Sequence, residues 1–305
     1  MTNEDRSAGR GASRPFEPEN SVAIVTGAAG GIGSALVRAL AGAGARLIVG
    51  VDLDGEHMAA VAEVLDAEFA NTTIAPAGLD VSDRAATTTL VEQVEAEHGH
   101  VGLFCANAGI GTAQGLDADP DTWQRVWDVN VMAHVHAAAV MVPRWTERGS
   151  GHLLVTASAA GLLSNLGDAA YSTTKHAAVA FAEWVAITHG ANGVGVTCLC
   201  PQGVRTPMVF GGEADEFAVL RSGTAPAQDT HIDHDRELAI AVVRAQGVIE
   251  PSDAANAALR SLTEGRFLAL PHPDVAAYEQ ARAADHDRWI TGMQKLQARL
   301  DAPGQ

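Results

Sequence analysis

The fold of this chain is decided by the stretch Thr26-Gly27-Ala28-Ala29-Gly30-Gly31-Ile32-Gly33. It follows a short apolar run, Val22–Thr26, that is typical of a buried strand, and it leads into a helical pattern over 33–43. Glycines let the backbone approach a phosphate closely, and the first N–H groups of a helix attract negative charge. A glycine-rich turn can also be a tight strand–helix connection only. The favoured interpretation is a strand–turn–helix unit that binds a pyrophosphate.

The same alternation of strands and helices continues outward from this stretch to about residue 270. Strands that are apolar on both faces, joined by helical crossovers, predict an α/β fold with a single doubly wound parallel sheet of the Rossmann type, about seven strands wide, and helices on both faces. Ser82 is expected to cap the third helix. The expected strands are 22–26, 46–52, 73–80, 101–107, 151–158, 194–201 and 266–270, and the expected helices are 33–43, 55–68, 83–98, 122–147, 171–189 and 251–263.

The 305 residues contain no linker that would divide the alternating region into two domains. Residues 1–20 are rich in polar residues, glycine and proline, lack an apolar stretch of signal-peptide type, and are expected to form a flexible N-terminal extension. The main domain is expected over 21–270 and a C-terminal helical extension over 271–305. This last segment has an amphipathic pattern, for which packing or a subunit contact is favoured over a cover for the binding site of its own or a neighbouring chain.

Composition excludes several classes of function. The formal net charge of −17 argues against nucleic acid and anionic membrane surfaces as partners. No apolar window is long enough for a transmembrane helix, so a cytoplasmic protein is expected. The twelve histidines lack metal-ligand spacing, so no metal is expected. The three cysteines are expected to be buried free thiols, with Cys198 and Cys200 pointing to opposite faces of a strand.

Asp52 indicates which dinucleotide would bind. It ends the second expected strand, where a carboxylate can accept hydrogen bonds from both ribose hydroxyls of an adenosine. The same charge repels a 2′-phosphate, and the glycine turn contains no Arg or Lys to offset it. NAD is therefore favoured over NADP as the cofactor. Asp54 is a rival for this role, but its position beyond the strand favours a surface or capping role.

A tyrosine and a lysine four residues apart, Tyr171 and Lys175, lie in the expected helix 171–189. This spacing places both side chains on one face of a helix. A phenol is a weak base at neutral pH, and a neighbouring ammonium group favours the phenolate by lowering the phenol's pKa. Such pairs are common on amphipathic helices with no function. With the glycine turn and Asp52 in the same chain, the pair is interpreted as a proton-transfer site.

These motifs, in this order, resemble the short-chain dehydrogenase/reductase family of the classical type over about residues 21–270. Thr26–Gly33 matches the family's T-G-x-x-x-G-x-G turn, and Asn107 and Gly109 match the end of its N-N-A-G segment, in which Ala106 replaces the first Asn. In the P-G-x-V-x-T segment, Gln202 replaces the glycine. The resemblance implies cofactor contacts at Gly27, Gly31, Ile32, Gly33, Asp52, Asp80, Val81, Asn107, Gly109, Tyr171, Lys175, Pro201, Val204 and Thr206.

The resemblance also implies a catalytic set of Asn130, Ser158, Tyr171 and Lys175. Tyr171 would exchange a proton with the substrate oxygen, and Ser158 would hold that oxygen beside it. Lys175 would lower the pKa of Tyr171 and bind the nicotinamide ribose. Asn130 would position a water molecule that links Lys175 to solvent. The expected function is that of an NAD-dependent oxidoreductase that interconverts a secondary alcohol and its ketone.

The substrate is read from the residues around the catalytic set. Leu162, Leu163 and Leu166 lie between Ser158 and Tyr171, and a substrate lid over about 207–247 begins with Met208, Val209 and Phe210. The segment between Ser158 and Tyr171 contains no Arg or Lys, which argues against a highly anionic substrate. An apolar small-molecule substrate is favoured, including cyclic or steroid-like alcohols. The alternative is that the leucines belong to the core only.

Three other functions remain open. One is an NADPH-linked carbonyl reductase that works in the opposite direction. Another is a sugar-nucleotide epimerase, which the glycine spacing and the short C-terminal part disfavour. The third is a non-catalytic NAD-binding protein on the same fold, which the intact catalytic set disfavours. The family resemblance also implies a homotetramer or homodimer, formed partly by the helices expected at 122–147 and 171–189.

Overall fold

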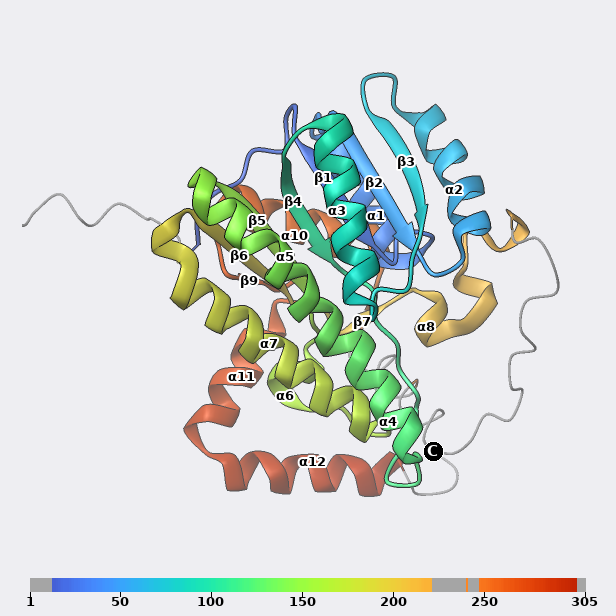
Figure 1. Cartoon of the computed structure of the whole chain (residues 1–305). Helices are drawn as coiled ribbons and strands as arrows, with labels where there is room; N and C mark the ends of the chain where they lie inside the picture. Colours follow the sequence, from blue (N-terminus) through green and yellow to red (C-terminus); the bar gives the residue numbers. More distant parts are fainter. Residues whose placement is uncertain (1–12, 221–239, 241–246, 301–305) are drawn as a thin grey trace, which may run out of the picture.

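The structure is a computed structural model that describes residues 13–220, 240 and 247–300. Its centre is a seven-stranded parallel sheet in the order β3-β2-β1-β4-β5-β6-β9 (Figure 1). The predicted doubly wound fold is confirmed. The strands of this sheet are β1 (Val22–Thr26), β2 (Leu47–Asp52), β3 (Thr73–Gly78), β4 (Val101–Ala106), β5 (Gly151–Thr156), β6 (Val194–Leu199) and β9 (Leu268–Ala269).

Helices cover both faces of the sheet, because successive side chains of a strand point to opposite sides. In β1, Val22 and Ile24 belong to a buried cluster with α3, α5 and α7, whereas Ala23 and Val25 belong to a second cluster with α1, α2 and α10. The helices are α1 (Gly31–Gly42), α2 (Gly55–Glu68), α3 (Arg84–His98), α4 (Pro120–Trp127), α5 (Ala133–Arg148), α6 (Ala160–Leu163), α7 (Ala169–His189), α8 (Pro207–Phe210), α10 (Pro251–Thr263), α11 (Asp274–Ala284) and α12 (His286–Leu300).

The remaining elements are short. A π-helical turn, Asp128–Met132, joins α4 to α5, so the single helix expected over 122–147 contains a widened turn. Three 3₁₀ turns lie at Gly190–Asn192, Gly211–Ala214 and Ala218–Leu220. Strands β7 (Gly203–Val204) and β8 (Val248–Ile249) pair with each other outside the main sheet. Most of the expected lid, 221–239 and 241–246, lies outside the described residues.

Two local predictions are wrong. The cap of α3 is Asp83, whose carboxylate accepts from the backbone N–H groups of Ala85 and Ala86, while Ser82 donates to Asp80 instead. The three cysteines are buried and free as predicted. The Sγ atoms of Cys198 and Cys200, however, lie only 3.8 Å apart. They share a face because residues two apart in an extended chain point the same way.

The described part of the predicted N-terminal extension is bonded to the domain. The backbone N–H of Ser13 donates to the carbonyl of Gly265, and that of Phe16 donates to the carbonyl of Leu262. The Phe16 side chain packs against the cluster on the α1 face. The prediction of a flexible segment therefore does not apply to residues 13–20. Residues 1–12 lie outside the described part of the chain.

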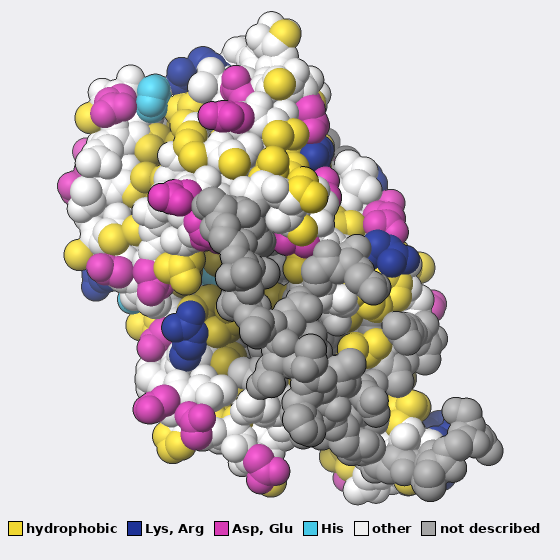
Figure 2. Space-filling model, turned by 90° about the vertical axis from the view of Figure 1, so that its right-hand side faces the viewer, with side chains coloured by type: hydrophobic (Ala, Val, Ile, Leu, Met, Phe, Trp, Pro, Cys, Tyr) yellow, Lys and Arg dark blue, Asp and Glu magenta, His cyan; other side chains and the backbone are white. Residues whose placement is uncertain are grey.

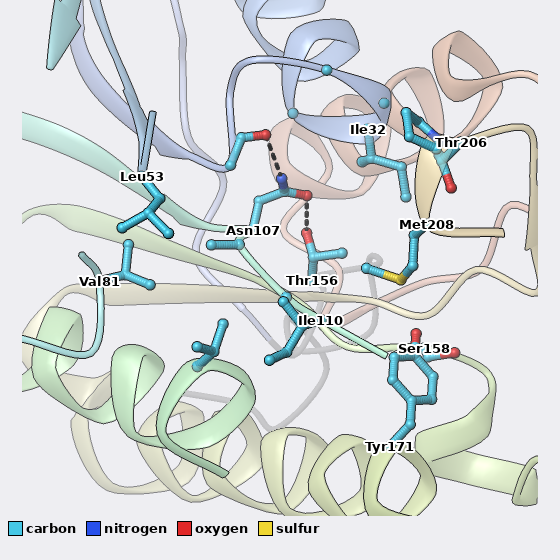
Figure 3. A pocket seen from close by; sticks show the side chains of 18 of the residues that line it. Ile32, Leu53, Val81, Asn107, Ile110, Thr156, Ser158, Tyr171, Thr206 and Met208 are labelled. Atoms are coloured by element: carbon cyan, nitrogen blue, oxygen red, sulfur yellow. Dashed lines mark hydrogen bonds between the residues drawn. The ribbon is translucent and has the colours of Figure 1, made fainter. Parts of the chain in front are cut away.

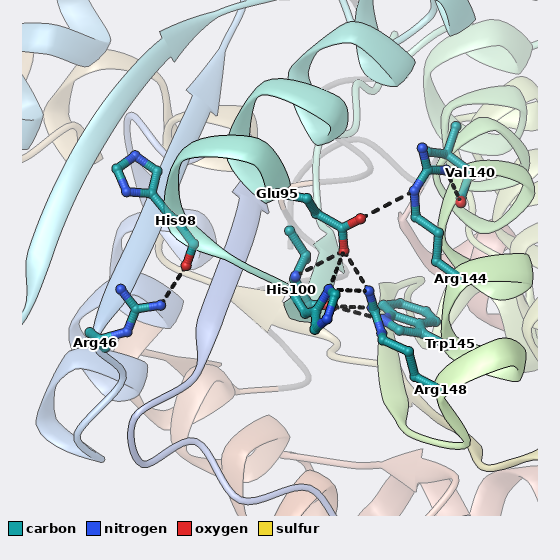
Figure 4. Close-up of polar contacts among 9 residues, drawn as sticks. Arg46, Glu95, His98, His100, Val140, Arg144, Trp145 and Arg148 are labelled. Carbon is teal, nitrogen blue, oxygen red and sulfur yellow. Dashed lines mark hydrogen bonds and ion pairs between the residues drawn. The ribbon is translucent and has the colours of Figure 1, made fainter.

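A polar network fixes α3 and α5 to β4, the strand that leads into Asn107 (Figure 4). The Glu95 carboxylate forms ion pairs with Arg148, at 2.7 Å, and with Arg144, at 3.3 Å. The indole N–H of Trp145 donates to the carbonyl of Val101 at 2.8 Å. Because Glu95 and Trp145 are largely buried, these contacts are shielded from solvent and define how the helices sit on the sheet.

The surface of the molecule reflects its acidic composition. Figure 2 shows a face on which Asp and Glu side chains are more frequent than Lys and Arg. Within the described residues, no helix has both the length and the apolar character needed to cross a membrane.

Candidate active site

The carboxyl ends of the parallel strands open into a cavity of about 650 Å³. Ligands of doubly wound sheets bind outside the carboxyl ends of the strands, at the point where the strand order reverses. Leu53 and Val81 lie toward one end of this cavity and Ser158 and Tyr171 toward the other (Figure 3). All fourteen residues expected to contact the cofactor line the cavity. Of the expected catalytic residues, Ser158, Tyr171 and Lys175 line it and Asn130 lies behind it.

The glycine turn has a backbone that other residues would strain. Gly27 and Gly31 have φ angles of +65° and +56°, in the left-handed region that favours glycine. A Cβ atom on Gly33 would lie 1.8 Å from the carbonyl oxygen of Gly27. The turn therefore requires glycine at these positions, and it presents the first N–H groups of α1 to the cavity. Such a bare backbone cradle fits a pyrophosphate.

Asp52 lies at the end of β2, on the rim of the cavity, as predicted. Its Oδ2 atom accepts from the N–H of Ala29 at 3.1 Å, and its Oδ1 atom accepts from the N–H of Leu53 at 2.8 Å. These bonds orient the carboxylate beside the glycine turn. Its rival Asp54 instead caps α2 by accepting from the N–H of His57 at 3.0 Å. The structure thus separates the two aspartates as the sequence suggested.

Asn107 ties together the ends of three neighbouring strands. Its Nδ2 atom donates to the carbonyl of Thr26 at 2.9 Å, and its Oδ1 atom accepts from the hydroxyl of Thr156 at 2.9 Å (Figure 3). The Thr26 hydroxyl accepts in turn from the N–H of Asn107. Sequence reasoning did not identify Thr156, although a threonine at the end of β5, two residues before Ser158, was a usable signal.

Asp80 and the loop after β6 complete the lining of the first cavity. The Ser82 hydroxyl and N–H both donate to Asp80 and lower the pKa of its carboxyl group. The Cγ2 atom of Thr206 lies 3.1 Å from where a Cβ atom on Gly31 would be, so this loop touches the glycine turn. Gln202, which departs from the family pattern, donates its N–H to the Nδ1 atom of His272 at 3.2 Å.

Ser158 and Tyr171 face each other at one end of the cavity (Figure 3). The Ser158 hydroxyl donates to the carbonyl of Pro201 at 3.3 Å and accepts from the N–H of Ala160 at 3.1 Å. Burial raises the pKa of Tyr171, the Ser158 hydroxyl lowers it, and the charge of Asp168 raises it further. The expected lowering by Lys175 is not among these causes. Burial dominates because it removes the water that would stabilise a phenolate.

Lys175 is buried beneath the cavity, with 2% of its surface exposed. Its Nζ atom donates to the carbonyl of Thr156 at 3.0 Å and lies 5.5 Å from the centre of the Tyr171 ring. Burial lowers the pKa of Lys175 to about 8. A Cβ atom on Gly109 would lie 3.2 Å from this Nζ atom, so Gly109 leaves room for the ammonium group.

Asn130 lies on the π-helical turn and has no exposed surface. Its Oδ1 atom accepts from the N–H of Ile110 at 2.8 Å, and its Nδ2 atom donates to the carbonyl of Ile110 at 2.9 Å and to the Thr174 hydroxyl at 3.1 Å. The side chain therefore holds the loop after β4 against α7. The expected role in positioning a water molecule stays a prediction.

Asp168 is a further site residue that sequence reasoning missed. It caps α7 by accepting from the N–H of Tyr171 at 2.9 Å. The same carboxylate accepts from the N–H groups of Thr112 and Ala113, both at 2.7 Å, and from the Thr112 hydroxyl at 3.1 Å. It thus joins the loop after β4 to the start of the helix that carries Tyr171. An aspartate three residues before the tyrosine matches a helix N-cap, and this was the available signal.

A second cavity, of about 610 Å³, adjoins the first. The two share Ser158, Tyr171, Gln202, Met208 and Val209 as lining residues. Leu163 and Leu166 line the second cavity as expected, whereas Leu162 does not; Leu162 and Leu163 both belong to the core cluster. The hydroxyl groups of Ser158 and Tyr171 therefore lie at the junction between a cavity that fits a dinucleotide and one that is mostly apolar.

A doubly wound sheet, a glycine turn at its first helix and a Ser–Tyr–Lys set beside it define a dinucleotide-dependent oxidoreductase. The family model described as short chain dehydrogenase matches residues 21–216. The chain belongs to the short-chain dehydrogenase family.

Individual relatives agree with this assignment. The chain is 38% identical over 195 residues to a 1-deoxy-11-beta-hydroxypentalenate dehydrogenase from Streptomyces avermitilis, a match that covers 63% of this chain and 71% of the relative. It is 31% identical over 252 residues to an uncharacterized oxidoreductase from Myxococcus xanthus, covering 79% and 96%. A short chain dehydrogenase/reductase from Burkholderia phymatum, solved in complex with NAD, superposes with a TM-score of 0.75 at 30% identity, covering 89% of this chain and 96% of that one.

Proposed function

We propose that this chain interconverts a secondary alcohol and its ketone, with NAD as the hydride carrier. The observation that carries this proposal is the position of Ser158 and Tyr171, which line both the dinucleotide-sized cavity and the adjoining apolar cavity. A substrate oxygen placed between these hydroxyl groups would lie where the two cavities meet. The non-catalytic alternative leaves this arrangement without a purpose.

The residues present fit a bound dinucleotide. The glycine turn would hold its pyrophosphate, Asp52 the adenosine ribose, and Lys175 the ribose next to the nicotinamide. Bound there, the nicotinamide ring would accept or give the hydride. Ser158 would hold the substrate oxygen, and Tyr171 would take its proton during oxidation and return it during reduction. Because burial raises the pKa of Tyr171, oxidation requires that the bound cofactor or high pH favour the phenolate.

NAD is proposed over NADP because of the charge on Asp52. The carboxylate is held at the rim by two backbone N–H groups and so cannot turn away easily. Among the described lining residues, the cations are Arg125 and Lys175; the charge of Arg125 acts on Asp80, and Lys175 is buried near Tyr171. A 2′-phosphate would therefore meet the fixed negative charge of Asp52. The NADPH-linked reductase is the alternative that this argument opposes.

An apolar alcohol is proposed as the substrate, including cyclic ones. Leu163, Leu166, Met208 and Val209 line the second cavity. The Streptomyces relative is named as a dehydrogenase of a hydroxypentalenate. The proposal also includes a cytoplasmic location, in keeping with three free thiols.

A homotetramer or homodimer forms part of the proposal. Trp184 and Ile187 on α7 are 56% and 76% exposed, which leaves large apolar side chains on the outer face of a helix that subunits are expected to share. Light scattering coupled to gel filtration would measure the mass of the particle in solution. A strictly monomeric protein would contradict this part of the proposal.

The function is tested by a screen of secondary alcohols with NAD and with NADP, following formation of the reduced cofactor. Oxidation of apolar alcohols with NAD is expected. A preference for NADP would contradict the argument from Asp52 and favour the reductase alternative. Binding of NAD without turnover of any alcohol or ketone across a broad panel would support the non-catalytic alternative instead.

A further inference from the structure

The C-terminal helix α12 carries an apolar row on one face. Trp289, Met293, Leu296 and Leu300 are four, three and four residues apart, a spacing that places them on one side of a helix. All four line the second cavity and are partly buried, and no residue of α12 is fully buried. Figure 1 shows α12 lying across the end of the molecule below α6 and α4. The apolar row therefore faces a hollow rather than a packed core.

Helix α11 holds α12 in this place. Val275 of α11 is buried in the core cluster on the α7 face. The rings of Tyr278, in α11, and Trp289, in α12, are 6.3 Å apart. Asp285, between the helices, accepts from the N–H of Arg288 at 2.9 Å and so caps α12. The position of the apolar row is thus set by packing and by a hydrogen bond.

The second cavity is lined mainly by apolar side chains. Leu163, Leu166, Met208 and Val209 belong to its lining together with the apolar row of α12. Among the described lining residues, Asp168 is the one charged group, and its carboxylate already accepts four hydrogen bonds. A charged substituent on a ligand would find no opposite charge among these residues. At about 610 Å³, the cavity has the volume of a typical small-molecule site.

We propose that α12 forms the outer wall of the substrate cavity of its own chain and that its apolar row selects bulky, uncharged alicyclic alcohols and ketones. This inference rests on the proposed function and adds its size and charge selectivity. A fused-ring substrate whose hydroxyl group reaches Ser158 and Tyr171 would cover the row and remove its apolar surface from water. A single-ring alcohol would reach the same hydroxyl groups and leave the row uncovered.

The row faces inward, which argues against the packing or subunit contact favoured from the sequence. The outer side of the same helix is represented by Ile290, which is 50% exposed and does not line the cavity. Ile290 therefore offers a matched control: an apolar residue of the same helix, adjacent to Trp289 in the chain, that points away from the cavity.

The test compares wild type with Trp289→Ala, Leu296→Ala and the control Ile290→Ala. The substrates are cyclohexanol, with one ring, and decahydro-2-naphthol, with two fused rings. We expect kcat/KM for decahydro-2-naphthol to fall roughly tenfold in each wall variant, while kcat/KM for cyclohexanol and the KM for NAD remain within about twofold. Ile290→Ala should match wild type with both substrates. Circular dichroism establishes that the variants are folded.

A direct binding measurement makes the inference testable without turnover. Calorimetric titration of the matching ketone, 2-decalone, into the NAD-loaded protein, a pair between which no hydride can pass, should show binding that both wall variants weaken roughly tenfold and that Ile290→Ala leaves unchanged. The inference would be overturned, and the proposed function left intact, if both wall variants kept the wild-type ratio of kcat/KM values for the two alcohols and the wild-type affinity for the ketone. Two other results would also overturn the inference: wall variants that change only the oligomeric state, and a wild-type protein that does not bind 2-decalone.

Discussion

The two cavities have similar volumes, about 650 and 610 Å³, but they are built in different ways. The first cavity is lined by the glycine turn, by polar side chains such as Asp52, Asn107 and Thr156 at the ends of strands, and by apolar side chains between them. The substrate cavity consists largely of apolar side chains, and part of its wall comes from α11 and α12 at the end of the chain. The family model matches residues 21–216 and so stops before these two helices.

The two cavities differ in how much substitution their walls should tolerate. A turn that needs Gly33, because a Cβ atom would collide with the carbonyl of Gly27, tolerates little change. An apolar wall requires only shape and hydrophobicity, and many side chains can supply both. The junction at Ser158 and Tyr171 couples a fixed cofactor site to an adaptable substrate site.

The largest expected effect comes from Tyr171→Phe, at the junction. Removing the hydroxyl group removes the proton donor and acceptor and leaves the ring in place, so kcat should fall roughly a thousandfold. The dissociation constant for NAD should stay within about threefold of wild type, since the glycine turn and Asp52 are untouched. Steady-state kinetics and calorimetric titration measure the two values. A variant that keeps a large share of the activity would remove Tyr171 from the mechanism.

The second prediction isolates the cofactor cavity. Asp52→Asn should lower the preference for NAD over NADP, expressed as a ratio of kcat/KM values, roughly 10- to 100-fold, because the charge that repels the 2′-phosphate is gone. The choice among alcohols should not change. The matched control is Asp54→Asn, which should weaken the cap of α2 without altering cofactor preference. Equal effects of the two variants would show that Asp52 is not the selecting group.

The sequence predicted these two regions unequally. The glycine turn, Asp52, Asn107 and the Ser–Tyr–Lys set were predicted because their chemistry depends on residue type and local spacing. Asp168 and Thr156 were missed because their partners, Thr112, Ala113 and Asn107, are brought to them only by the packing of separate strands and loops.

The place of α12 could not be predicted for a different reason. Its apolar row was visible in the sequence, but a helical stripe has the same pattern whether it packs on a core, a subunit or a ligand cavity. The shift in the pKa of Tyr171 was likewise unpredictable, because burial, which dominates it, is a property of the folded site.

A third prediction concerns Lys175, which lies beneath the junction. Burial lowers its pKa from 10.5 to about 8, so between these pH values the unfolded chain binds more protons than the folded chain. Burying the ammonium group therefore lowers the free energy of unfolding by its full amount below pH 8. This cost shrinks as the pH rises, because Lys175 loses its proton in the folded protein. The difference in the free energy of unfolding, Lys175→Met minus wild type, should fall by roughly 2 kcal/mol between about pH 7 and 10.

Urea unfolding of both proteins at the two pH values measures this difference. The control is Lys295→Met, which replaces an exposed lysine of α12 and should show no pH-dependent difference from wild type. A pH-independent effect of Lys175→Met would indicate that Lys175 is not held as a desolvated ammonium group, and the account of the junction would lose its buried cation.

The smallest expected effect belongs to Asp168, on the substrate side. In Asp168→Asn one carboxylate oxygen becomes an NH2 group, which cannot accept from the N–H groups that it faces, so the loop after β4 should loosen and kcat/KM should fall about tenfold. The charge of Asp168 raises the pKa of Tyr171, so its loss should also shift the rise of kcat with pH toward lower pH.

That shift distinguishes an effect of the Asp168 charge on Tyr171 from a general loss of structure, which would lower kcat without moving its pH profile. The affinity for NAD should not change, because Asp168 lines the second cavity only. The control is Asp119→Asn, which alters the exposed cap of α4. A weakened affinity for NAD in Asp168→Asn, with an unshifted profile, would contradict the separation of the two cavities.

The central claim is that a hydride passes directly between the contents of the two cavities at Ser158 and Tyr171. It is tested most directly by supplying an alcohol that carries deuterium on its carbinol carbon together with NAD, and by measuring the reduced cofactor by mass spectrometry. The account predicts that the deuterium is found in the reduced cofactor, which is then one mass unit heavier than unlabelled NADH. Ketone formed with unlabelled NADH, the deuterium having passed to water, would contradict it.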